Sequence, residues 1–543
     1  MTESPDRESS SRADEYTRNF LEQEALPTIW QELAFHRRFV PGITLDEING
    51  LHADWFPDRN RLIVVSAPDA SGVVLPNQTQ LAAVVKTASA KRLERYVDGA
   101  AAQSLMDTAP KRGTIANEKV DSKTAITEWT LSNGAKVVLK PTTLKEDQIL
   151  FRATAPGGTS LASDGDLIPA RVADDVVPAG GVGAFNAVTL NKILSGKAVA
   201  VTPFINEVDE GMAGGSTPQD LETMFQLLYL RFSQPRADPT AFAALASQAK
   251  GLLANRLASP EVVFNQTINA IVSQNSRRRE PQTPESVDQW NLDKSLAFYK
   301  ARFGDASNFT FVFVGSFKPE TIKPLIETYV ASLPATHSRE TWRDVGIAPP
   351  RGIVERTVEK GIDQKSEVAI VFSGPFDYDD QHRLALRTMT LLLESRLSDA
   401  IRQELGGTYS ITATPGTRKS PRPEFSVRID WTCDPARTSS LVERVFQEIK
   451  FIKDTPISRG QVTRIRDLLL RELESNSEDN AYLLNEISRS YEDGDAAGAA
   501  AIGNLPDQIA ALTGDAIQQA AQRYLDLQNY VKVTLVPDGK PSG

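Results

Sequence analysis

The chain has 543 residues, of which 41% are hydrophobic and 24% are charged, and its formal net charge is −10. This length exceeds what one hydrophobic core normally supports, so we expect two or three domains. An acidic chain is not typical of a nucleic-acid-binding protein, because phosphate binding relies on clustered Lys and Arg. The one compact basic run, Arg277–Arg279, precedes Glu280 and Pro281 and is interpreted as a solvated loop.

Targeting signals are weak in this chain. Its first residues, MTESPDRESSSRADEY, are polar and acidic and contain no apolar core of the kind found in signal peptides. No run of about 18 apolar residues occurs, so no membrane-spanning helix is predicted. The single cysteine, Cys433, excludes an intrachain disulfide and suits any compartment. We expect a soluble protein, periplasmic if a partner half carries an export signal and otherwise cytoplasmic.

A helix, an Asn-containing turn and an apolar run follow one another three times along the chain. The copies are ITLDEINGLHADWFPDRNRLIVVSAPD, LDKSLAFYKARFGDASNFTFVFVGSF and LTGDAIQQAAQRYLDLQNYVKVTLVPDG. Their apolar runs begin near Arg61, Phe309 and Tyr530, in steps of 248 and 221 residues. Such steps are too long for a solenoid repeat and suit a whole domain, so each copy predicts the end of one domain.

The first copy predicts that residues 1–110 contain the C-terminal tail of a preceding domain and a helical linker. Thr44 can cap a helix and Glu47 can close a capping box, and Arg61–Ser66 is a short apolar run that suits a buried strand. A linker helix is predicted over Thr79–Tyr96. The front of that domain is then missing or supplied by another chain. The alternative is a private N-terminal helical extension.

Residues 120–340 are predicted to form a complete unit. EWTLSNGAKVVLK has two strand-like runs around Asn133-Gly134, a pair that favours a tight hairpin turn. An amphipathic helix is predicted for LETMFQLLYLRF. Further strands are predicted over Gln148–Ala155, Ala198–Ile205 and Glu207–Ala213.

Residues 345–543 are predicted to repeat this plan. A strand over Glu367–Ser373 leads to a long helix through HRLALRTMTLLLESRLSDAIRQEL, then to a hairpin of TYSITATP and FSVRIDWTC. Helices fill residues 436 to about 525. The predicted class is α+β, with tandem repeated domains that each have a mainly antiparallel sheet with helices packed on one face.

Two long segments resemble a known family. LNKILSGKAVAVTPFINEVDEGMAGGSTPQDLETMFQLLYLRFSQPR resembles the third domain of long insulinase/pitrilysin-type (inverzincin) zinc metallopeptidases, and ESRLSDAIRQELGGTYSITATPGTRKSPRPEFSVRIDW resembles the fourth. The resemblance covers roughly residues 120–543, and the first 110 or so resemble the close of the second domain. It implies an inactive peptidase-like domain over 120–340 and a C-terminal peptidase-like domain over 345–543, which together make the non-metal half.

The metal motif of that family is not found in this chain. There, two histidines of H-x-x-E-H and a downstream Glu bind zinc, and the Glu between the histidines activates the zinc-bound water. The equivalent segment, GDLIPARVADDVV, offers Asp174 and Asp175 but no imidazole. We predict no metal or cofactor in this chain and zinc on the partner half. None of the four histidines, His36, His52, His337 and His382, belongs to an H-x-x-E-H motif.

Arg402 and Tyr409 are the candidate catalytic residues, acting in trans. In R-Q-E-L-G-G-T-Y they stand seven positions apart, which resembles the Arg and Tyr of the family's non-metal half, although Thr408 separates Gly407 from Tyr409. The resemblance implies that both side chains reach the zinc site of the other half. A Tyr hydroxyl can stabilise the oxyanion of peptide hydrolysis, and a guanidinium can hold the substrate backbone. The structural alternative is a helix-end charge complementing the helix dipole and a core tyrosine.

The resemblance implies a non-catalytic half of a zinc metallopeptidase that helps to enclose and position substrate. Its partner would be a half or subunit carrying H-x-x-E-H, its substrate a peptide or unfolded polypeptide, and no activity is expected from the chain alone. Two other hypotheses stay open: a catalytically inert structural or peptide-binding protein of the same fold, and a truncated gene product.

Overall fold

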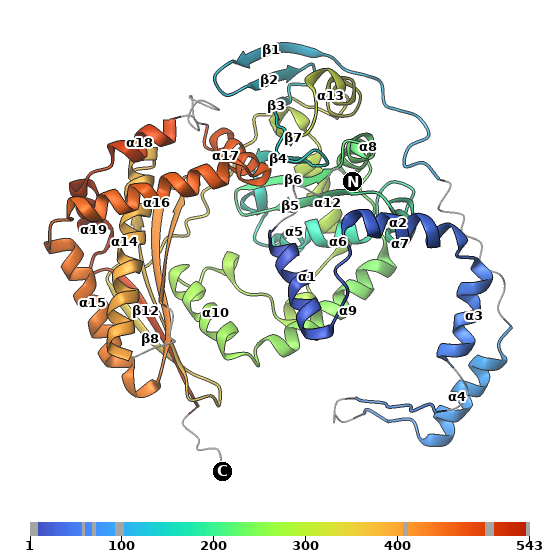
Figure 1. The fold of residues 1–543 in the computed structure, drawn as a ribbon, viewed down its shortest axis with the longest axis horizontal. Coiled ribbons are helices and arrows are strands. Elements are labelled where there is room, and N and C mark those ends of the chain that lie inside the picture. Colours follow the sequence, from blue (N-terminus) through green and yellow to red (C-terminus); the bar gives the residue numbers. More distant parts are fainter. Residues whose placement is uncertain are drawn as a thin grey trace. The chain divides into compact units, whose positions relative to one another are not determined.

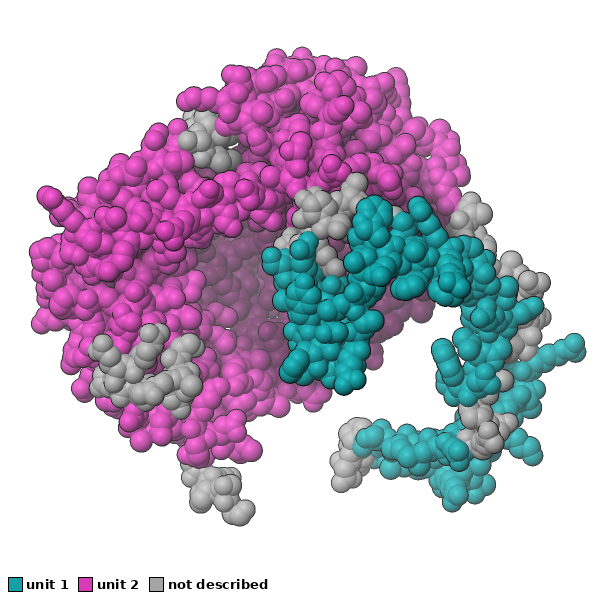
Figure 2. All heavy atoms as spheres, viewed as in Figure 1, with its two compact units in different colours: residues 1–102 teal, residues 103–543 magenta. Residues whose placement is uncertain are grey.

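The computed structural model describes residues 9–56, 60–67, 72–92, 103–405, 411–494 and 504–538 (Figure 1). Side chains 52, 53 and 402–405, although within helices, lie outside this description. The chain divides into two units, residues 1–102 and 103–543 (Figure 2). Among the described residues, no helix is long and apolar enough to cross a membrane.

The first unit consists of helices without a core. None of its helices has a buried residue among the side chains that the structure describes. One half of the predicted capping box is present, since the Thr44 hydroxyl accepts a hydrogen bond from the Glu47 N–H at 3.2 Å. The helices are α1 (Ser9–Glu22), α2 (Ile29–Phe39), α3 (Leu45–Trp55) and α4 (Gln78–Ala90).

Two sequence-based expectations for this unit need correction. The strand predicted over Arg61–Ser66 is not formed, and these residues are exposed coil. The physical reason is that a strand requires partner strands for its backbone groups, and none pairs with this segment. The linker helix predicted over Thr79–Tyr96 ends at Ala90, and residues 93–102 lie outside the described parts.

The first half of the second unit contains a seven-stranded sheet in the order β1-β2-β3-β7-β4-β6-β5. All neighbouring strands are antiparallel except β3 and β7. Gly134, with φ +87°, makes the predicted turn between β2 and β3. The strands are β1 (Ile115–Asp121), β2 (Ile126–Leu131), β3 (Lys136–Pro141), β4 (Ile149–Pro156), β5 (Val199–Ile205), β6 (Asp209–Ser216) and β7 (Thr310–Gly315).

Helices α6, α8 and α12 of this half pack on one face of the sheet. α8, which carries the predicted amphipathic run, buries seven side chains, and α12 packs beside α6. The helices are α5 (Leu167–Arg171), α6 (Ala173–Ala179), α7 (Ala187–Ile193), α8 (Leu221–Ser233), α9 (Pro239–Arg256), α10 (Pro260–Val272), α11 (Pro284–Val287), α12 (Leu292–Phe303) and α13 (Pro319–Leu325).

The second half contains a five-stranded sheet in the order β10-β11-β9-β12-β8, in which only β12 and β8 are parallel. Its strands are β8 (Ile353–Glu359), β9 (Ser366–Pro375), β10 (Ile411–Arg418), β11 (Glu424–Cys433) and β12 (Tyr530–Val536). Its helices are α14 (Asp380–Leu405), α15 (Thr438–Asp454), α16 (Arg459–Ser477), α17 (Asn480–Glu492), α18 (Leu505–Ala511) and α19 (Gly514–Tyr524). The α+β class with tandem repeats is thereby confirmed.

The two halves exchange a helix. Alternate residues of a strand face opposite sides, and in β9 the side chains of Val368 and Ile370 join the core beneath α14, whereas Ala369 and Val371 pack against α10. α10 belongs to the first half in sequence. Reciprocally, α17 of the second half packs on β4 and β7 (Figure 1). Each sheet is therefore covered on both faces, whereas the sequence patterns predict helices on one face.

Candidate functional site

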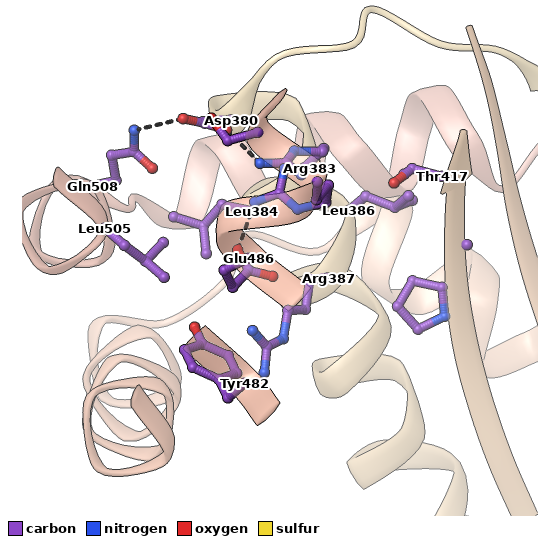
Figure 3. Close-up of a pocket in the computed structure, with 14 residues that line it drawn as sticks. Asp380, Arg383, Leu384, Leu386, Arg387, Thr417, Tyr482, Glu486, Leu505 and Gln508 are labelled. Atoms are coloured by element: carbon purple, nitrogen blue, oxygen red, sulfur yellow. Dashed lines mark hydrogen bonds and ion pairs between the residues drawn. The ribbon is translucent and has the colours of Figure 1, made fainter. Parts of the chain in front are cut away.

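A pocket of about 280 Å³ lies beside the N-terminal part of α14 (Figure 3). α14, α17, α18 and residues 415–417 of β10 supply its walls, so the pocket depends on the long helix predicted from the sequence. Its polar lining includes Asp380, Arg383, Arg387, Tyr482, Glu486 and Gln508.

Charged side chains around this pocket pair with one another. Arg383 forms an ion pair with Asp380, and Asp380 also accepts a hydrogen bond from Gln508 at 3.4 Å (Figure 3). Burial, and then the Glu486 carboxylate, raises the pKa of Tyr482, so its phenol stays a hydrogen-bond donor at neutral pH. Such a pocket can bind polar groups of a peptide. Its carboxylates, Asp380 and Glu486, are paired with Arg383 and Arg489, so we assign it no catalytic chemistry.

The predicted pair Arg402 and Tyr409 is only partly placed by the structure. Arg402 lies in the last turn of α14, but its side chain and all of Tyr409 fall outside the described residues. Arg387, in the pocket, precedes Arg402 by 15 positions on the same helix. At a helical rise of about 1.5 Å per residue, the two lie roughly 22 Å apart along the axis. The pocket is therefore at a different place on α14 from Arg402.

The segment equivalent to the family's metal helix is formed by α5 and α6, which are interrupted at Val172. Asp174 accepts a hydrogen bond from the Ile205 N–H at 2.9 Å, and burial raises its pKa to about 6. Burial also raises the pKa of Asp175. Two such carboxyls without an imidazole do not suit zinc, which needs several converging, deprotonated ligands. Within the described parts of the chain, no group of three or more His, Cys, Asp or Glu side chains is arranged to hold a metal.

The histidines have separate surroundings. His382 is half-buried and its Nδ1 lies 2.7 Å from Asp379 Oδ2. His36, in the last turn of α2, and His337 are exposed, and the side chain of His52 lies outside the described residues.

A buried ion cluster that no sequence motif marks surrounds Glu210 in β6. Glu210 is 2% exposed and accepts a hydrogen bond from the Gly158 N–H. Arg302 of α12 lies 3.7 Å from Glu210 and 2.9 Å from Glu340. Burial raises the pKa of Glu210 to about 7 despite these favourable contacts. The only signal in the sequence is a charged residue inside a predicted strand.

Fold and site together define a class: tandem α+β domains that carry no metal cluster among the described residues. A family model described as "Peptidase M16 inactive domain" matches residues 289–469, from the end of the first half into α16 of the second. A curated relative, "Zinc protease PQQL-like" of Arabidopsis thaliana, is 22% identical over 504 residues, which cover 89% of this chain and 50% of the relative.

Solved structures agree with this class. The periplasmic protease PqqL from Escherichia coli has a TM-score of 0.71 at 18% identity over 98% of this chain and 58% of that one. A peptidase M16 inactive domain from Pseudomonas fluorescens has a TM-score of 0.62 at 14% identity over 76% of this chain and 98% of that one. The chain spans about half the length of the curated relatives it matches.

The chain is thus similar to zinc proteases of the insulinase/pitrilysin type, and its residues 289–469 match the inactive domain of that family.

Proposed function

We propose that this chain is the non-catalytic half of a zinc metallopeptidase. It works with a half that carries H-x-x-E-H, helps to enclose a peptide or unfolded polypeptide, and donates Arg402 and Tyr409 to the reaction there. The match to an inactive peptidase domain, in a chain whose equivalent helix offers Asp174 and Asp175 rather than histidines, is the observation that carries the proposal. The enzyme would be periplasmic if the metal-bearing half is exported.

Each of the two residues has a distinct role. The Tyr409 hydroxyl donates a hydrogen bond to the carbonyl oxygen that becomes negatively charged when water attacks the peptide bond. Arg402 remains protonated and binds the substrate backbone through its forked donors. Support comes from α14, which brings Arg402 to its C-terminal turn, immediately before the segment that contains Tyr409.

Peptide cleavage by the assembled halves tests this function. Tyr409→Phe should lower kcat about 10²–10³-fold, the usual cost of an oxyanion donor, and Arg402→Ala should mainly raise KM. Exposed residues of the same types serve as matched controls: Tyr16→Phe in α1 and Arg464→Ala in α16 should change neither constant. Unchanged cleavage in both test variants would remove the catalytic role. Chelator-sensitive cleavage or stoichiometric zinc in the isolated chain would contradict the assignment of zinc to the other half.

A further inference from the structure

The three helix–turn–strand copies share one spacing. An aromatic residue at the end of the helix precedes an Asn by five positions in each copy: Trp55 and Asn60, Phe303 and Asn308, Tyr524 and Asn529. A side-chain cap begins each helix, from Thr44, Asn291 and Thr513. The apolar run starts directly after the Asn. The common plan makes the copies comparable position by position.

In the second and third copies the strand has the same place in its sheet. β7 lies between β3 and β4, parallel to β3 and antiparallel to β4. β12 lies between β8 and β9, parallel to β8 and antiparallel to β9. In both cases the last strand of a half enters between two strands that are consecutive in sequence. Phe303 and Tyr524, the aromatic residues of these two copies, are 0% and 1% exposed.

In the first copy the same positions are exposed. Trp55 is 70% exposed, Leu62 85% and Val64 76%. The corresponding β12 residues, Val531 and Val533, are 2% and 0% exposed. A contiguous apolar segment of this kind marks an interaction site, because leaving it in water forgoes the free energy of burial.

The composition of the run is typical of a central strand of a sheet rather than of an edge strand. Leu62, Ile63, Val64 and Val65 are all apolar, so both faces of the strand would be apolar. In β7, alternate residues likewise face opposite sides of the sheet. Phe311 and Phe313 lie in one core cluster, and Val312 and Val314 lie in another. In each of the two sheets of residues 103–543, this central position is already occupied by the sheet's own copy, which is β7 in one and β12 in the other. The first copy therefore has no equivalent vacancy in either sheet.

We propose that residues 44–67 complete a third sheet, which is formed by the metal-bearing half. Residues 61–67 enter this sheet as a central strand, parallel to one strand and antiparallel to the next, and Trp55 fills its core. The choice of partner rests on the proposed function and on the half of the relatives' length that this chain does not cover. The manner of insertion rests on the two copies within this chain. Strand addition supplies main-chain hydrogen bonds, and the buried aromatic anchors the contact.

Amide hydrogen exchange tests the insertion. The probe is the H-x-x-E-H half encoded by the source organism, purified as its own polypeptide and added to the full 543-residue chain. Exchange at residues 62–65 should slow at least about 100-fold on mixing, as expected for amides at the centre of a stable sheet. Val64→Pro removes a ladder N–H and should weaken association about 100-fold or more, and Trp55→Ala should weaken it about 10- to 100-fold.

Val74→Pro is the matched control, because Val74 lies in coil outside the copy and is 90% exposed. It should bind as the wild type does. Val64 packs in no core, so circular dichroism should show both proline variants as folded as the wild type. A complex whose residues 62–65 exchange freely would overturn the proposal, as would wild-type binding by Val64→Pro. Protection of the isolated chain through self-association would assign the segment to a second copy instead. If exchange at residues 62–65 slows in the complex but Tyr409→Phe leaves its cleavage rate unchanged, only the proposed function would be contradicted.

Discussion

At the scale of single residues, Glu210 shows how burial can override favourable contacts. The Gly158 N–H and the Arg302 guanidinium both favour its charged form, yet desolvation is the larger effect and raises its pKa to about 7. Between about pH 4.5 and pH 7, the folded protein therefore keeps a proton on Glu210 that the unfolded chain, with a pKa near the ordinary 4.5, has released.

Glu210→Gln should change how stability depends on pH. The stability contributed by the Glu210 proton is fully present below about pH 4.5 and is lost as pH rises through 7, because the folded state binds more protons than the unfolded state. Relative to the variant, the wild type should lose about 1–3 kcal/mol between pH 5 and pH 8. Urea unfolding of both proteins at the two pH values measures this. Identical pH dependence in the two would show that Glu210 ionises normally in the fold.

At the scale of elements, the exchanged helices α10 and α17 hold the two halves together. Phe264 of α10 is 0% exposed and packs against strands of the second sheet. Asn480, at the start of α17, is fully buried, accepts a hydrogen bond from Thr142 at 2.7 Å and donates one to Gln148 at 3.0 Å. The contact thus combines apolar burial with satisfied polar groups.

Phe264→Ala should destabilise the protein by about 3–5 kcal/mol, because it leaves a cavity between α10 and the sheet. Asn269→Ala, on the exposed side of the same helix, is the control and should change the free energy of unfolding by less than about 0.5 kcal/mol. Chemical denaturation measures both values. A loss below about 1 kcal/mol in Phe264→Ala would mean that α10 is not held on the second sheet.

At the scale of the whole molecule, the described part of residues 103–543 contains two sheets that share their covering helices. Neither half buries both faces of its sheet with its own helices. We therefore expect the two halves to unfold together, in contrast to domains joined by a flexible linker.

Two buried tryptophans can report on this coupling separately. Trp129 lies in the first sheet and Trp431 in the second, and each is 2% exposed. In variants that keep only Trp129 or only Trp431 of the six tryptophans, denaturation followed by fluorescence should give coincident midpoints. Phe264→Ala should lower both midpoints together. Separate transitions for Trp129 and Trp431 would show that the halves are energetically independent.

Much of the fold follows from local patterns. The turn at Asn133-Gly134 and the strands over β4, β5, β6 and β9 were predictable because glycine punctuation and apolar runs are local signals. β1 and β8 were not predicted. Among the residues that the structure describes, β1 pairs only with β2 and β8 only with β12, so each is an exposed edge strand whose polar sequence carries little periodic signal.

The candidate site was less predictable. Motif spacing identified Arg402 and Tyr409, but the pocket on α14 brings Asp380 together with Tyr482 and Gln508, which lie 102 and 128 residues further along the chain. No local sequence pattern predicts which of these distant residues meet at the pocket.

The sequence by itself determined the class of this protein, its repeated plan and the absence of H-x-x-E-H, because these depend on residue identity and short-range spacing. Only the tertiary structure decided that α10 and α17 cross between the halves, that Glu210 lies buried beside Arg302, and that Leu62–Val65 stays exposed while its two counterparts are central strands. The reason is physical. Burial depends on which distant surfaces meet, and an apolar run becomes a strand only where neighbouring strands are present to pair with it.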